Sequence, residues 1–189
     1  LKYHNLTLAA LLLSVALAWV WCGLFAPFHE CTHQAAFKTK RLNTIGTWLA
    51  GVPFAMSPSV YKTFHFEHHR HTQEVDKDPE LLNDSRYLEW PAGQKNWFSM
   101  ALGLGLINLK LSPLLGFAFK PRERWHEFAK WVHLAPDPAR LVLECKIITV
   151  SWLVFLVACL FWIPGGGWLV FAAWLTHVFQ TLWVASEHT

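Results

Sequence analysis

Long stretches without a charged residue divide this chain into apolar segments. Residues 5–28 contain no charged side chain, and neither do residues 147–186. Because a helix needs about 20 apolar residues to cross a bilayer, the first stretch predicts one transmembrane helix and the second has room for two. Pro164 and the three glycines after it interrupt the second stretch. We therefore expect a hairpin whose transmembrane arms cover 141–163 and 168–186.

Three shorter apolar segments are less regular. Residues 42–61 are uncharged but contain two glycines and two prolines, which oppose a straight spanning helix and favour a re-entrant or interfacial segment. Residues 96–119 include an asparagine, a lysine and a proline, so we expect a shallow or partly buried position. Residues 121–134 begin with a proline and place Trp125 and Phe128 on one side, with basic residues free for lipid headgroups. This last pattern predicts an interfacial helix.

Composition supports a membrane protein. Hydrophobic residues make up 53% of the chain and charged residues only 15%, against about 25% charged residues in soluble domains. The fold class we expect is all-α, an integral membrane helical bundle with interfacial helices, formed by one domain over residues 1–189. The four cysteines lack paired spacing, which excludes a disulfide scaffold. A start at Leu1 and an end at Thr189 lead us to expect a domain that is incomplete at both ends.

The charged residues are distributed unevenly along the chain. The net charge of +3 is too small to indicate a nucleic-acid partner. However, 14 of the 16 lysine and arginine residues lie between Lys38 and Arg140, and the positive-inside rule places such a region on the cytoplasmic side. Glu144, near the start of the first hairpin arm, is expected to extend to the membrane interface.

A first histidine cluster directly follows the first apolar segment. His29 and His33 are four residues apart, so on a helix both imidazoles share one face and can bind one metal ion or a pair. Two polar histidines at a membrane boundary are the simpler alternative. With Glu30 the same residues also match H-E-x-x-H, the helix of zinc metalloproteases. A zinc protease needs only one further protein ligand, which would leave the next cluster without a role.

A second cluster contains four histidines within seven residues. On a helix His65, His68 and His69 cover about 100° of one face, whereas His71 falls about 60° outside it. Crowded imidazoles repel one another when protonated, but a metal ion requires them neutral. The cluster therefore predicts a metal site, with a solvated polar loop as the alternative.

The number of histidines and the topology narrow this metal site. Imidazole suits iron, copper, zinc and nickel, and five histidines exceed the four ligands of a structural zinc site, so we expect two metal ions. Because the clusters must share one side of the bilayer, 42–61 should not cross it. The hairpin returns to that side, which makes His188 a sixth candidate. The predicted metal ligands are His29, His33, His65, His68, His69 and His188.

With HECTH after one apolar segment, HFEHH about thirty residues later and SEHT after the hairpin, the chain resembles the membrane fatty acid desaturases, a family of integral-membrane di-iron oxidoreductases. The resemblance implies that His29 and His33, then His65, His68 and His69, bind two non-haem iron ions at the cytoplasmic face. It implies the same role for His188. The family's third histidine box would lie beyond Thr189, so the fragment alone is expected to be inactive.

The resemblance also implies a reaction. Such an enzyme uses O2 to introduce a double bond into a fatty acyl chain of a lipid, with electrons from an external donor such as ferredoxin or a cytochrome b5-type carrier. Carotenoid and sterol hydroxylases and ketolases share the histidine boxes and remain the alternative. We expect membrane lipids as neighbours and a bacterial cytoplasmic membrane rather than the endoplasmic reticulum.

Several acidic side chains close to the histidines in the sequence could support the metal site. Carboxylates can orient metal-binding imidazoles through the free ring N–H, and the candidates for this are Glu30, Glu67, Asp76 and Glu187. The role of His71 stays open. His177 is expected not to bind metal, although its mid-membrane position requires some reason.

Overall fold

The structure, a computed structural model, describes residues 2–80, 98–99, 101–131 and 135–187. These residues contain helices and turns and no strand, which confirms the all-α prediction for them. The principal helices are α1 (Lys2–Gly23), α2 (Phe25–Thr32), α3 (Lys40–Gly51), α4 (Pro58–His71), α7 (Leu104–Phe119), α8 (Pro138–Phe161) and α9 (Gly166–Glu187). Two short 3-10 helices, η1 (Val52–Phe54) and η3 (Arg122–Glu127), connect them.

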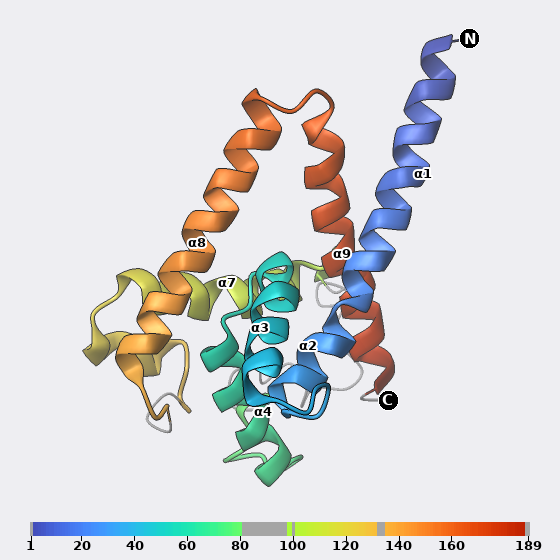
Figure 1. Cartoon of the computed structure of the whole chain (residues 1–189). Helices are drawn as coiled ribbons and strands as arrows, with labels where there is room; N and C mark the ends of the chain where they lie inside the picture. The colour runs from blue at the N-terminus through green and yellow to red at the C-terminus, as the bar shows by residue number, and fades with distance from the viewer. Residues whose placement is uncertain (1, 81–97, 100, 132–134, 188–189) are drawn as a thin grey trace.

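Helices α1, α8 and α9 form a column that rises from a broader group of shorter helices (Figure 1). Helix α1 runs parallel to α9 and packs along it. The Ser14 hydroxyl donates to the Trp168 carbonyl at 3.2 Å near the hairpin tip. Further along, the rings of Trp19 and Phe179 meet edge to face, with centroids 5.7 Å apart. This packing brings the end of α1 down to the short helices that carry the histidines.

Within the described residues, two helical stretches are long and apolar enough to cross a membrane, Leu6–Thr32 and Pro138–Phe161. Their outward side chains include Leu13, Leu160 and Phe161, which are 70%, 68% and 75% exposed. Large apolar side chains on the outside of a helix column fit contact with lipid. The predicted second arm, 168–186, also forms a helix, α9, which is not one of these two stretches and which buries the polar residues Thr176, His177, Gln180 and Thr181.

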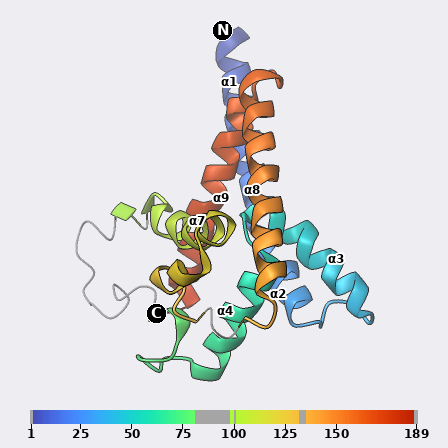
Figure 2. The same cartoon turned by 90° about the vertical axis from the view of Figure 1, so that its left-hand side faces the viewer.

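The segment 42–61 divides into α3, η1 and the start of α4. Ala55 adopts a left-handed backbone conformation with φ of 54°, which ends η1 and reverses the chain. The Ser57 hydroxyl then accepts the Val60 N–H as the N-cap of α4, and Pro58 occupies the first turn. The chain therefore returns towards α2, and α2 and α3 lie beside the lower part of α8 while α4 extends below it (Figure 2).

Close contact between α2 and α3 depends on glycine. A Cβ atom at Gly46 would lie 2.5 Å from the Cys31 Sγ, and one at Gly51 would lie 2.7 Å from the Phe28 ring. Both distances are below any normal carbon contact, so only glycine permits this approach. The packing fixes the end of α2, where His29 and His33 lie.

The interfacial helix predicted for 121–134 is not present in that form. The structure has only the 3-10 helix η3 over Arg122–Glu127, followed by a turn, and residues 132–134 lie outside the described part. The reason is the packing of Trp125, which is buried, donates its indole N–H to the Lys120 carbonyl and meets Phe117 of α7 edge to face. The segment therefore packs onto α7 through this side chain, and its interfacial position stays a prediction.

Candidate metal centre

Four of the predicted ligands lie together where α2 meets α4. His29 lies in α2 and His33 caps its C-terminal end, while His65 and His69 are one turn apart in α4. One ring nitrogen from each of the four lies within 4.8 Å of the others. Helix periodicity places each pair on one face, and the packing of α2 and α4 turns these faces towards each other. The structure thus brings residues from both histidine clusters to one point.

The distances within this cluster fit a shared cation. His65 Nε2 lies 2.9 Å from His33 Nε2 and 3.0 Å from His69 Nε2. Two nitrogens held about 2.1 Å from one ion at a right angle to each other would lie about 3.0 Å apart. Without a cation, one ring of each pair must donate an N–H to the other. The donor set is all imidazole, which suits iron, copper, zinc or nickel.

The electrostatics of the cluster favour neutral imidazoles. Burial lowers the pKa of His65 to about 3, and the neighbouring His29, His69, His33 and His68 add like-charge repulsion. Burial also lowers the pKa of His33, with His29 and His69 acting in the same direction. A metal ion binds the neutral form of an imidazole ring. At neutral pH these rings therefore need not lose a proton before they bind a metal ion.

His68 has a carboxylate partner of its own, which distinguishes it from the four clustered rings. Its Nδ1 lies 2.9 Å from Oδ1 and 3.1 Å from Oδ2 of Asp78, a fully buried side chain. Asp78 also accepts the backbone N–H groups of Gln73 and Glu80. Burial acts to raise the pKa of Asp78, but the hydrogen bonds from His68, Gln73 and Glu80 hold it below its usual value. This bond fixes the orientation of the imidazole.

Tyr61 holds the other side of the cluster. Its ring stacks on that of His65 with centroids 4.8 Å apart and an angle of 14° between the planes. The same ring packs against Phe28 of α2, with centroids 4.6 Å apart. A buried tyrosine between the two helices therefore restricts the rotation of His65. The histidine spacing alone does not indicate this residue.

Glu144 holds the start of α4, although it lies 87 positions after Ser57 in the sequence. Its carboxylate accepts the Ser57 hydroxyl at 2.8 Å and the Ser59 backbone N–H at 2.7 Å, and Arg140 donates to it at 2.8 Å. The side chain is buried, so the expectation that it extends to the membrane interface was wrong. A carboxylate at the N-terminus of a helix is also favoured by the helix dipole.

The other candidates lie in different places. Glu30 Oε1 accepts from His29 Nδ1 at 3.0 Å, as expected for a carboxylate that orients a ligand. Glu67 is buried and pairs with Arg70, three residues later in α4, and His71 bonds to Glu74 at 3.1 Å. Neither Glu67 nor His71 belongs to the four-residue cluster. Asp76 is exposed. The predicted ligand His188 and the side chain of Glu187 lie outside the described residues.

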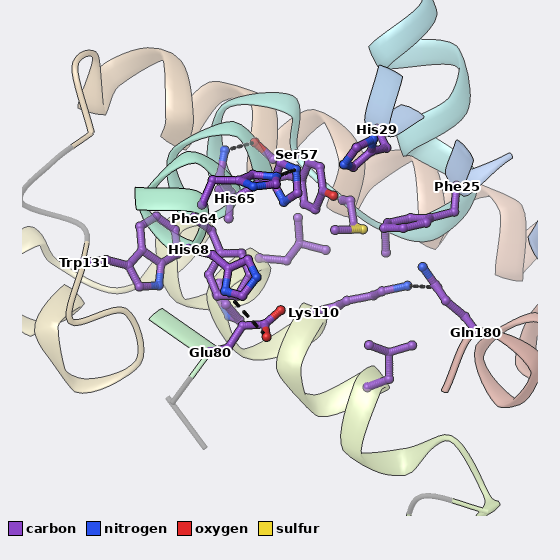
Figure 3. A pocket seen from close by; sticks show the side chains of 18 of the residues that line it. Phe25, His29, Ser57, Phe64, His65, His68, Glu80, Lys110, Trp131 and Gln180 are labelled. Atoms are coloured by element: carbon purple, nitrogen blue, oxygen red, sulfur yellow. Dashed lines mark hydrogen bonds and ion pairs between the residues drawn. The ribbon is translucent and has the colours of Figure 1, made fainter. Parts of the chain in front are cut away.

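A cavity of about 450 Å³ opens beside the cluster. Figure 3 shows His29, His65 and His68 along one part of its wall and Lys110 and Gln180 along another. Most of the remaining lining is apolar, including Phe25, Met56, Val60, Phe64, Leu106 and Leu114. An apolar space that adjoins a cluster of metal-binding side chains has the composition of a small-molecule site.

The chain is similar in sequence to known proteins of one family. A curated relative, the sn-1 acyl-lipid omega-3 desaturase (ferredoxin) of Nostoc sp. (strain 36), is 26% identical over 168 residues, covering 82% of this chain. The chain spans about 45% of the length of that relative. No solved structure matches the chain. Residues 6–189 match the family described as Fatty acid desaturase, and the chain therefore belongs to the fatty acid desaturase family.

Proposed function

We propose that this chain forms the metal-binding part of an oxygen-dependent acyl-lipid desaturase. The observation that carries the proposal is the meeting of His29 and His33 of α2 with His65 and His69 of α4 beside an apolar cavity. Membership of the fatty acid desaturase family supports it independently. The same observations favour a desaturase over a zinc protease, because the second histidine cluster joins the first.

Six histidines would hold two iron ions. His29, His33, His65 and His69 offer nitrogens to a common centre, while His68, oriented by Asp78, and His188 would complete the set. When bound, the iron pair supplies O2 chemistry that removes hydrogen from an unactivated CH2 group, which zinc cannot do because it has no redox change. The chain's own residues position these rings and hold them neutral.

The overall reaction sets what the rest of the protein must do. Two hydrogen atoms leave adjacent CH2 groups, O2 is reduced to two waters, and the donor side supplies two electrons with two protons. The apolar cavity would hold the acyl chain and exclude water from it. We propose a ferredoxin as the donor, since the curated relative's name includes one, with a cytochrome b5-type carrier as the alternative. The exposed Lys38, just before α3, and the exposed Lys40 and Arg41 at its start offer a basic surface for such a carrier.

We further propose that the protein lies in a bacterial cytoplasmic membrane with the metal centre on the cytoplasmic side. The predicted positive-inside orientation supports this sidedness, because most of the basic residues lie on the segments around the cluster. Membrane lipids would surround the outward apolar side chains of α1 and α8.

Lipid profiling tests the proposed reaction. The full-length coding sequence, expressed in a host with a simple fatty acid composition, should produce lipids with new double bonds. The matched His68→Ala variant should produce none at equal expression. Hydroxylated or oxidised products in place of double bonds would assign the protein to the hydroxylase and ketolase alternative. Unchanged lipids in cells that supply both electron carriers would contradict the proposal.

A further inference from the structure

Lys110 is a buried cation in the wall of the cavity that adjoins the histidine cluster. Lys110 lies in the middle of α7, and only 8% of its surface is exposed. Figure 3 shows the side chain reaching from α7 towards Gln180 and away from Glu80. The mechanism proposed above gives this lysine no role. A lysine is among the most costly residues to bury, so its place requires an explanation.

The groups around the ammonium are all neutral. Lys110 Nζ donates to Gln180 Oε1 and lies 3.3 Å from His177 Nδ1, both on α9. It also lies 4.9 Å from the centre of the Phe54 ring. No carboxylate forms an ion pair with Lys110 in the part of the chain that the structure describes. The contact with Lys110 also accounts for the presence of a polar residue, His177, in the interior of α9.

A purely structural role does not require a lysine here. A neutral amide at position 110 could join α7 to Gln180 and His177 without placing a charge in the interior. Burial lowers the pKa of Lys110 to about 7, so the charged form is held weakly until an anion or a strong acceptor approaches. Two protons of the ammonium point at Gln180 and His177, and no oxygen among the described residues accepts the third. A ligand oxygen in the cavity would provide that acceptor.

Basic and acidic side chains lie at different parts of the cavity wall. Lys110 supplies a basic group beside Gln180, whereas Glu30 contacts His29 and Glu80 lies 3.7 Å from His68 at another part of the wall. A ligand with an apolar chain and an oxygen-bearing end would be repelled by the carboxylates at that end. Its oxygen would therefore face Lys110 and its chain would extend along the apolar wall towards the cluster.

We propose that Lys110 binds the carboxyl-derived oxygen of an acyl chain in this cavity, and thereby sets which end of the chain faces the histidine cluster. This role of Lys110 rests on the proposed function in one respect only, namely that the ligand is an acyl chain. The oxygen can belong to a free carboxylate or to an ester. Lys110 is thus a specificity-determining residue that acts on the substrate and not on the metal.

Photolabelling of the metal-free protein tests this without any turnover. The full-length protein in phosphatidylcholine nanodiscs is labelled with octadecanoate that carries a mid-chain diazirine, and the labelled residues are mapped by mass spectrometry. Octadecanoate, methyl octadecanoate and octadecanol then compete for labelling. Lys110→Gln keeps hydrogen-bonding groups at this position and removes the charge, and Lys110→Met removes both. Lys146→Met, an exposed lysine on α8, is the matched control.

In the wild type and in Lys146→Met, labels should lie on cavity residues and octadecanoate should compete best. In Lys110→Gln, competition by octadecanoate should weaken about tenfold or more, as expected for the loss of one charge-assisted hydrogen bond, while octadecanol should compete as before. A parallel loss for the methyl ester would identify an ester oxygen as the group bound, and its absence a carboxylate.

Equal competition by octadecanoate in the wild type and in Lys110→Gln, with both proteins folded by circular dichroism, would overturn the role of Lys110 alone. If no label reaches the cavity of the wild type, the acyl-chain ligand itself is wrong, and the proposed function fails with it. Should Lys110→Met not fold, Lys110→Gln and the comparison of acid with alcohol in the wild type still decide the question.

Discussion

Nε2 of His33 at the end of α2 lies 2.9 Å from Nε2 of His65 in the middle of α4. The two residues are 32 positions apart in the chain, and no local rule of helix geometry brings them together. Their approach depends on the close packing of α2 against α3 and on the return of the chain at Ala55. Two ring nitrogens at this distance need a shared proton or a shared cation, because two lone pairs repel.

Asp78→Asn should weaken metal binding without unfolding the protein. The buried carboxylate orients His68 through its Nδ1, and loss of such a partner typically costs about 10- to 100-fold in metal affinity. Competition with a chelator of known affinity measures the effect on iron(II) or zinc. Asp76→Asn is the control, since Asp76 is exposed two positions away. Equal affinities for the two variants would show that Asp78 does not orient a ligand.

Glu144→Ala should destabilise the fold by about 3–5 kcal/mol, the cost of leaving a buried charged network without one partner. Ser57 and Ser59 would lose the acceptor that holds the start of α4, and Arg140 would lose its carboxylate. Denaturant unfolding in detergent micelles measures the change. Glu123→Ala on the exposed side of η3 should have little effect. An unchanged midpoint for Glu144→Ala would mean that α4 begins there without this carboxylate.

Gly46→Ala should destabilise the protein, because its Cβ would lie 2.5 Å from the Cys31 Sγ. Overpacking of this kind costs about 1–3 kcal/mol, partly offset by the better helix propensity of alanine. Cys31→Ala removes the clashing sulfur, so the double variant should recover most of the loss. Gly23→Ala, where a Cβ meets nothing within 4 Å, is the control. Thermal unfolding of the wild type, Gly46→Ala, Cys31→Ala and the double variant gives the coupling free energy between the two positions. Additive losses of stability would refute the contact.

The metal-free protein should lose stability as the pH falls below about 6.5. Unfolded His65 takes up a proton near its ordinary pKa, whereas in the folded protein the pKa is lowered to about 3. Between these values the unfolded state binds more protons, so the free energy of unfolding decreases as the pH falls, by at most about 1.4 kcal/mol per pH unit for one proton. His65→Asn should show a shallower dependence in denaturant unfolding between these pH values. An identical dependence would mean that His65 is not held neutral by the fold.

Local patterns in the sequence predicted much of the fold. Uncharged runs predicted helices at the positions of α1, α8 and α9, and four-residue spacing placed His29 with His33 and His65 with His69 on common faces. The need for both clusters on one side of the bilayer predicted that 42–61 turns back, and the chain does return at Ala55. These inferences rest on periodicity and length, which the sequence contains directly.

Contacts between distant segments were out of reach of the same reasoning. Glu144 near the start of α8 looked like an interfacial residue, because nothing nearby in the chain reveals that Ser57 and Ser59 meet it. Lys110 appeared only as an interruption in an apolar run. Asp78 was a missed partner with a local signal, since it lies ten positions after His68 in an acidic turn that could fold back.

Metal analysis of the purified full-length protein tests the central claim most directly. After aerobic expression with added iron, the wild type should contain about two iron ions per chain, as two sites rich in imidazole ligands require. His65→Ala, which removes the ring that contacts both His33 and His69, should lose most of that iron while remaining folded. One zinc ion per chain in place of iron, or unchanged iron in His65→Ala, would contradict the account.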